Sequence, residues 1–170
     1  MTIATQRLII RPYEEGDLKD FHEIFSNEAV MRFCEPPYSH ADSQKWLGYF
    51  IQNPIAFAVV LKSGGKAIGH ALFKQLPGEE QGIWEIGWIF NQAFWRRGYA
   101  FEAASTLMAY GFETLKLHKI CAETTDPEKS VPLMKKLGMQ EEGVFRQHTK
   151  GNDGSWADLY WYAALAPEYP

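Results

Sequence analysis

The sequence predicts a single mixed α/β (α+β) domain, in which one mostly antiparallel sheet carries helices on both faces. The chain has 170 residues, a length typical of one domain. Hydrophobic residues make up 46% and aromatic residues 15%, enough for a substantial core. The strand-like and helix-like stretches run in the order strand, two helices, three strands, helix, strand, helix, two strands. This order combines hairpins with a strand–helix–strand crossover, so we expect about seven strands in one domain over residues 1–170.

The first half of the chain predicts a strand, two helices and a hairpin. RLIIRPY (7–13) is a short apolar run rich in β-branched residues, which favours a strand. EEGDLKDFHEIFSN (14–27) and SHADSQKWLGYFIQN (39–53) place apolar residues at helical spacing, and Ser39 is a candidate N-cap of the second helix. AFAVVLK and AIGHALFKQ flank the turn SGGK (63–66), which predicts a hairpin.

The second half predicts the crossover and a closing hairpin. IWEIGWIF (83–90) and HKICAETT (118–125) are strand-like, and the long stretch 98–117 between them has a broad apolar surface typical of a helix packed on a sheet. DPEKSVPLMKKLGM (126–139) predicts a helix that ends at Gly138. The runs 140–150 and 156–165 flank the turn GNDG and predict two further strands.

Charge and composition argue against several classes of protein. The net charge of −4 does not favour nucleic-acid binding, which needs a basic surface. The longest apolar run, Ile55–Leu61, is far shorter than a membrane span, and the apolar run before Arg11 is too short for a signal peptide. The two cysteines, Cys34 and Cys121, are expected to be reduced, and the histidines show no short ligand spacing. We therefore expect a cytoplasmic protein without a membrane segment, a nucleic-acid partner or a metal.

The stretch FWRRGYAFEAA (94–104) places two arginines and a glycine between a strand and a helix. A helix that starts near Gly98 leaves its first amide N–H groups unpaired at the positive end of its dipole, where phosphate binds well. Arg96 and Arg97 add charge and donors suited to phosphate. On spacing alone, this reading and a plain turn with solvated arginines are equally supported. Neither a P-loop nor a dinucleotide-binding glycine motif is present.

Several segments, in this order, resemble the GNAT superfamily of acetyl-CoA-dependent N-acetyltransferases. They are IWEIGWIFNQAFWRRGYAFEA, the long helix after it, LHKICAETTD and LMKKLGMQEEG. The opening TQRLIIRP and the tail EGVFRQHTKGNDGSWADLYWYAAL resemble the RimJ/RimL-like branch. The resemblance covers nearly the whole chain. It implies a sheet that is splayed in the middle and a direct transfer of acetyl from acetyl-CoA to an amine.

The resemblance also implies which residues hold the cosubstrate. In the family, backbone amides of the loop and helix start bind the CoA pyrophosphate, and the strand before them lines the pantetheine arm. A backbone N–H near Ile89 would stabilise the oxyanion, and Gly87 is either a bulge that opens the sheet or a packing glycine. The implied cofactor-binding residues are Trp88, Ile89, Phe90, Trp95, Arg96, Arg97, Gly98, Tyr99, Ala100 and Phe101.

The chain departs from the family pattern in the helix that follows. Pro127 and Met134 stand where relatives often have a CoA-contacting asparagine and a proton-donating tyrosine. Ser130 is the fallback proton donor, although a serine there more often caps a helix. These departures keep an alternative open, namely a CoA-binding sensor or interaction module with weak catalysis. A longer acyl group is a further possibility.

The general base is expected to be a carboxylate beside the splayed strands. Glu85 is the first candidate and Glu123 the second, with solvated or ion-paired carboxylates as the plainer interpretation of both. Glu35, in a loop that forms the acceptor wall in the family, could attract an amine. The acceptor is left open among a peptide N-terminus, a polyamine, an antibiotic amine and another small amine, and a homodimer is possible by resemblance.

Overall fold

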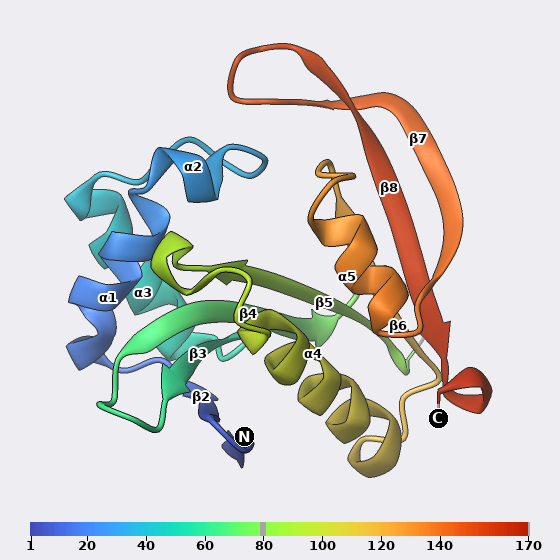
Figure 1. The fold of residues 1–170 in the computed structure, drawn as a ribbon, viewed down its shortest axis with the longest axis horizontal. Coiled ribbons are helices and arrows are strands. Elements are labelled where there is room, and N and C mark those ends of the chain that lie inside the picture. The colour runs from blue at the N-terminus through green and yellow to red at the C-terminus, as the bar shows by residue number, and fades with distance from the viewer. Residues whose placement is uncertain (79–80, 170) are drawn as a thin grey trace.

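The protein, seen here in a computed structural model that describes residues 1–78 and 81–169, is built around one eight-stranded sheet (Figure 1). The strand order is β1-β2-β3-β4-β5-β6-β8-β7. The strands are β1 (Ile3–Ala4), β2 (Leu8–Pro12), β3 (Ala56–Leu61), β4 (Ala67–Gln75), β5 (Ile83–Phe90), β6 (Lys119–Thr124), β7 (Gln140–Lys150) and β8 (Trp156–Leu165). β5 and β6 pair in parallel and the other neighbours are antiparallel. The predicted fold class is confirmed, and the strand beyond the expected number is the two-residue β1.

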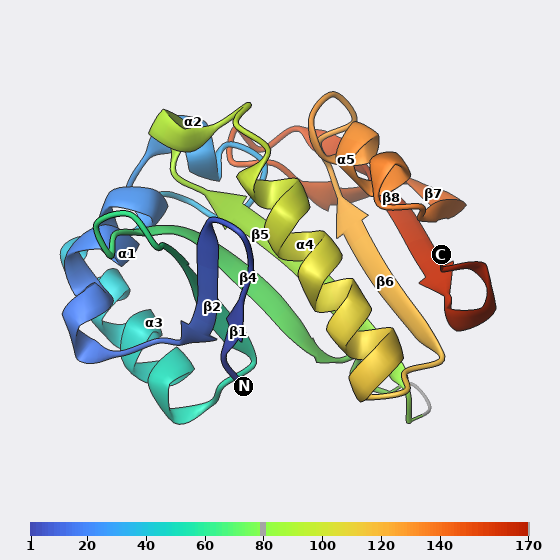
Figure 2. The same cartoon turned by 60° about the horizontal axis from the view of Figure 1, so that its bottom comes forward.

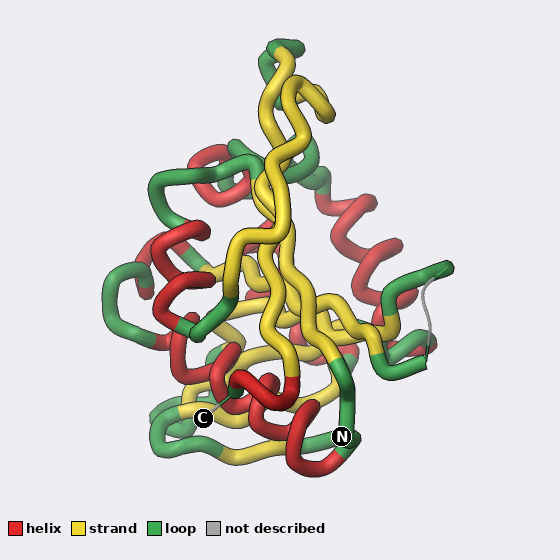
Figure 3. The backbone as a smooth tube through the Cα atoms, turned by 90° about the vertical axis from the view of Figure 1, so that its right-hand side faces the viewer, coloured by secondary structure: helices red, strands yellow, loops and turns green. Residues whose placement is uncertain are grey.

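Helices cover both faces of this sheet (Figures 2 and 3). α1 (Leu18–Phe25), α2 (Glu28–Met31) and α3 (His40–Gln52) lie on one side. α4 (Tyr99–Ala109), which continues as a π-helical turn over Tyr110–Thr114, and α5 (Ser130–Lys136) lie on the other. Short 3₁₀ turns occupy Glu15–Asp17, Gln92–Phe94 and Ala166–Glu168. Among the described helices, none has the length and apolar character that crossing a membrane requires.

Each face of the sheet has its own buried cluster. On the α4 side, Ala103, Ala104 and Leu107 pack against sheet residues such as Ile86 and Ile120. On the other side, the aromatic and aliphatic residues of α1 and α3 pack on alternate residues of β3 and β4. The two clusters meet the prediction of a sheet that is buried on both faces.

The helix boundaries differ from the sequence prediction in two places. α2 was not expected, because its four residues lie in a stretch that reads as a loop; the Asn27 side chain caps it by accepting from Ala29 N and Val30 N. α5 begins at Ser130 rather than near Asp126. The Asp126 carboxylate accepts from the amides of Glu128 and Lys129 and so holds a turn ahead of the helix. Ser39 caps α3 as predicted.

The sheet opens between β5 and β6. Their pairing runs only from Ile83–Lys119 to Glu85–Cys121, although β5 continues to Phe90 and β6 to Thr124. The expectation of a bulge at Gly87 is wrong, because the β4–β5 register is unbroken. Gly87 is opposite Leu72, whose side chain a Cβ at position 87 would meet at 3.4 Å, an ordinary van der Waals contact. The opening therefore comes from the loss of β5–β6 pairing alone.

Candidate active site

The junction between β5 and α4 has the backbone geometry of an anion site. Arg96 and Gly98 both lie in the left-handed region, with φ of 60° and 79°. Gly98 is the N-cap of α4, and no side chain caps the helix. Within the described residues, the amides of Tyr99, Ala100 and Phe101 have no hydrogen-bond partner. Successive amides in such a turn, at the positive end of a helix, form a concave site for phosphate.

The first strand of the chain holds this junction in place. Arg7 donates from Nε to Glu102 of α4 at 2.6 Å and from Nη1 to the Arg97 carbonyl at 3.0 Å. Its guanidinium also lies 4.4 Å from the centre of the Tyr99 ring. Thr5 adds a hydroxyl bond to the same Glu102 carboxylate. The sequence predicted a strand in this opening segment, and its contacts show that the segment also fixes the start of α4.

A cleft of about 1330 Å³ extends from this helix start to the gap between β5 and β6. It is lined by all the predicted cofactor residues except Arg97, and also by Glu85, Glu123 and Ser130. Arg97 points elsewhere: its guanidinium lies 5.6 Å from the centre of the Phe94 ring. The structure thus brings together residues from β5, β6, α4 and α5 that are far apart in the sequence.

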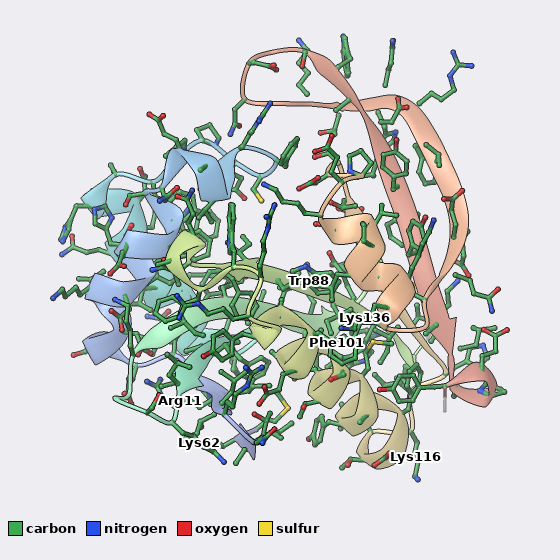
Figure 4. The ribbon with its side chains drawn as sticks, viewed as in Figure 1. Arg11, Lys62, Trp88, Phe101, Lys116 and Lys136 are labelled. Atoms are coloured by element: carbon green, nitrogen blue, oxygen red, sulfur yellow. The ribbon has the colours of Figure 1, made fainter. Side chains whose placement is uncertain are left out.

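Two lysines lie at the α5 side of the cleft. Lys136 sits 4.4 Å from the centre of the Phe101 ring, and Figure 4 shows both residues where α4 and α5 approach each other, with Trp88 nearby. Lys129 lies 4.5 Å from the Trp95 ring centre. These exposed ammonium groups add positive charge beside the free amides of α4.

The edge of β5 that faces the gap presents unpaired backbone groups. Asn91 N donates to Ile68 O, so odd-numbered residues of β5 direct their amides toward β4. The even-numbered residues Trp88 and Phe90 therefore face the gap, and the Phe90 carbonyl already accepts from Trp95 Nε1 at 2.7 Å. The backbone N–H beside Ile89 that points into the gap is thus that of Trp88.

The two candidate bases have different surroundings. Glu85 is mostly buried and forms an ion pair with the Lys74 ammonium at 3.4 Å. Glu123 is exposed to the cleft, yet partial burial of its carboxyl and the negative charge of Glu85 raise its pKa, against smaller opposing effects of His148 and Lys74. A carboxyl with a raised pKa is better suited to take a proton from an ammonium near neutral pH.

In α5 the sequence differs from the family pattern, and the structure shows the surroundings of Met134 and Ser130 there. Met134 is 1% exposed and belongs to the core cluster on the α4 side; it also lines the cleft, where its thioether has no proton to give. Ser130 is the first residue of α5, and its hydroxyl has no hydrogen-bond partner among the described residues. It does not act as the helix cap that the sequence made plausible: Lys129 is the N-cap, and no side chain of the described residues caps α5.

The opposite side of the cleft is closed by the segment after α2. Asn152, in the β7–β8 turn, donates to the carbonyls of Met31 and Glu35 at 3.0 Å each, so the hairpin tip reaches across to this segment (Figure 1). Glu35 accepts from Tyr38 Oη at 2.8 Å and lines the cleft. His70, which the sequence analysis did not single out, also lines it. Among the described residues, no group of three or more His, Cys, Asp or Glu side chains is placed to hold a metal ion.

A splayed sheet with a phosphate-binding helix start beside the opening defines the class of acyl-CoA-dependent transferases. Comparison with known proteins agrees. The profile of the acetyltransferase (GNAT) domain matches residues 7–140. The chain therefore belongs to the GNAT family and is an acetyl-CoA-dependent N-acetyltransferase.

Similar proteins support this assignment. The chain is 38% identical to the uncharacterized N-acetyltransferase YnaD of Bacillus subtilis (strain 168) over 174 aligned residues, covering 99% of each. It is 34% identical to a GNAT-family acetyltransferase from Bacillus anthracis, with a TM-score of 0.90 and coverage of 99% of this chain and 100% of that one. The spermidine N-acetyltransferase of Vibrio cholerae shares the fold, with a TM-score of 0.81, 24% identity and coverage of 97% and 99%.

Proposed function

We propose that the chain binds acetyl-CoA in the 1330 Å³ cleft and transfers the acetyl group directly to a primary amine that enters from the α2 side. One observation carries this proposal: the same cleft joins the free amides of α4 to the gap between β5 and β6 and to Glu123. The pyrophosphate fits the amides of residues 99–101, and the pantetheine arm fits the unpaired edge of β5 as an added strand would.

The proposed chemistry needs three groups at the gap. Glu123 removes a proton from the acceptor ammonium, either directly or through water, and the free amine attacks the thioester carbonyl. The Trp88 amide stabilises the oxyanion that forms. The nitrogen of the tetrahedral intermediate then loses its second proton, the C–S bond breaks, and the leaving thiolate takes up a proton. Ser130 is the candidate that relays this nitrogen proton to the thiolate and so ends as a hydroxyl again, because it lines the cleft and its hydroxyl is uncommitted among the described residues.

The acceptor class is proposed from the carboxylates around the gap. Glu35, Glu85 and Glu123 all line the cleft, which favours a cationic amine. Among the solved structures of the same fold are a ribosomal-protein-S5-alanine acetyltransferase and a spermidine N-acetyltransferase, which act on a protein and on a polyamine. We propose a peptide N-terminus or a small primary amine. The RimJ/RimL-like segments of the sequence support the former.

The test is release of CoA thiol from acetyl-CoA in the presence of a panel of amines and short peptides. We expect turnover with at least one acceptor and a loss of turnover in Glu123→Gln without a change in CoA affinity. Glu142→Gln is the matched control, because Glu142 pairs with Lys119 at 2.6 Å and does not line the cleft. Tight CoA binding with no turnover on any acceptor would instead support the CoA-binding module.

A further inference from the structure

His70 is a buried polar side chain at the floor of the acceptor side of the cleft. It lies on β4 opposite Ile89 and is 6% exposed. The rings of Tyr13, Phe25 and Phe50 surround it, with centroids 5.8, 5.2 and 5.1 Å away. None of the steps proposed above uses this residue, although it lines the same cleft.

The hydrogen bond to Tyr13 fixes which nitrogen of His70 carries the proton. Tyr13 Oη lies 3.0 Å from Nδ1 and has no other partner among the described residues. Burial keeps the phenol protonated by raising the pKa of Tyr13, and it lowers the pKa of His70 to about 3, so the imidazole is neutral. Because the phenol O–H has no other acceptor among the described residues, it donates to Nδ1, and the proton of the neutral ring is then on Nε2.

The Nε2–H group is free to donate a hydrogen bond to a molecule bound in the cleft. Every fully buried side-chain nitrogen or oxygen of the described residues has a hydrogen-bond partner. Nε2 has no protein partner in that part of the chain, so it reaches the accessible surface of the cleft that His70 lines. The result is a fixed, neutral donor in a chamber whose other walls include the apolar residues Val30 and Leu72.

We propose that His70 is a specificity-determining residue whose Nε2–H donates to an oxygen atom of the acceptor. This inference rests on the proposed function. A buried donor is costly to leave unpaired, so the site favours an amine that also carries a carbonyl or hydroxyl oxygen. An alkylamine or a polyamine has no such oxygen and leaves the donor without a partner. An aminoacyl amide, as at a peptide N-terminus, has a carbonyl oxygen two bonds from the carbon that bears the amine.

The test compares two amines of similar shape in three proteins. Alaninamide carries the oxygen, and 3-methylbutan-2-amine replaces the amide by an isopropyl group. His70→Gln keeps a donor at the position of Nε2, whereas His70→Asn can bond Tyr13 but does not reach the cleft. We expect His70→Asn to lower the ratio of kcat/KM values, alaninamide over alkylamine, by about three- to tenfold. His70→Gln should retain most of the wild-type ratio.

The outcomes separate this inference from the proposed function. Equal losses with both amines in a folded His70→Asn protein that still binds CoA would assign His70 a structural role and overturn the inference alone. A wild-type protein that acetylates no amine would overturn the proposed function and the inference with it. If His70→Asn does not fold, the imidazole ¹⁵N resonances of the wild-type protein decide. A proton on Nδ1 would overturn the proposal. So would an Nε2–H resonance that does not shift when alaninamide is added.

Discussion

The buried imidazole of His70 makes the stability of the fold depend on pH. Burial lowers the pKa of His70 from 6.5 to about 3. Below pH 6.5 the unfolded chain therefore binds a proton at His70, whereas the folded chain does not. The free energy of unfolding falls as the pH falls through the window from 6.5 to 3. Above pH 6.5 both states hold a neutral imidazole, and the effect vanishes.

The size of the effect follows from the pKa difference. Within the window, each pH unit lowers the free energy of unfolding by about 1.4 kcal/mol. Lowering the pH from 7.5 to 4.5 should therefore lower it by about 2.7 kcal/mol. Such a loss is a large part of the roughly 5–15 kcal/mol that stabilises a typical domain.

The assay is urea unfolding of the wild type and of His70→Gln at several pH values from 7.5 to 4.5. Carboxylates with shifted pKa values, such as Glu102 and Glu123, contribute equally to both proteins, so they cancel in the difference. We expect the wild type to lose about 2.7 kcal/mol more than the variant over this range. Equal slopes would show that His70 is protonated in the folded state and would refute the assignment of a neutral ring.

Three further predictions concern catalysis, CoA binding and packing. Glu123→Gln should lower kcat by about a hundredfold or more and remove the acid limb of the pH–rate profile. Glu85→Gln should only shift that limb to lower pH, because the charge of Glu85 raises the pKa of Glu123. Loss of the limb in Glu85→Gln would instead make Glu85 the base. Gly98→Ala should weaken CoA binding in calorimetry by about five- to thirtyfold through strain at φ 79°, while Gly64→Ala, equally strained at φ 97° in the β3–β4 turn, should leave it unchanged. Gly111→Ala should cost about 1–3 kcal/mol in chemical unfolding, because its Cβ would lie 2.8 Å from Ile120 Cδ1, while Gly48→Ala, with no atom within 4 Å, should be neutral or stabilising; equal effects of the two changes would contradict this packing argument.

The sequence predicted the sheet, the order of the elements along the chain, and helices α1 and α3, because long runs of periodic apolar residues indicate secondary structure clearly. It missed β1 and α2, since two and four residues show no periodicity. It placed the start of α5 too early, at Asp126. An aspartate that accepts from the amides two and three residues later can begin a helix or hold a separate turn, and the sequence does not distinguish the two. The opening of the sheet was expected from resemblance, but its cause was not, because a bulge and a loss of pairing look alike in one strand.

The candidate site divides in the same way. The CoA side depends on backbone amides at a strand–helix junction, and a glycine followed by a helix is visible in a contiguous stretch. The acceptor side depends on side chains from β4, β6 and the segment after α2, which only the folded chain brings together. Lys74 could not be linked to Glu85, because the register of β4 and β5 decides that pair. Tyr13 could not be linked to His70, because it follows β2, which β3 separates from β4 in the sheet.

This division bears on how substrate choice can change within such a fold. The amides proposed to hold CoA are independent of side-chain identity, so the donor site should tolerate substitutions that keep the helix start and Gly98. The acceptor chamber instead depends on a few polar atoms, namely the Glu123 carboxyl and the Nε2–H of His70, set among apolar walls. A single exchange at position 70 should leave CoA binding intact and change which oxygen, if any, the acceptor must carry. Acceptor preference in this protein should therefore follow residues on β4 and β6 rather than the arginines at the start of α4.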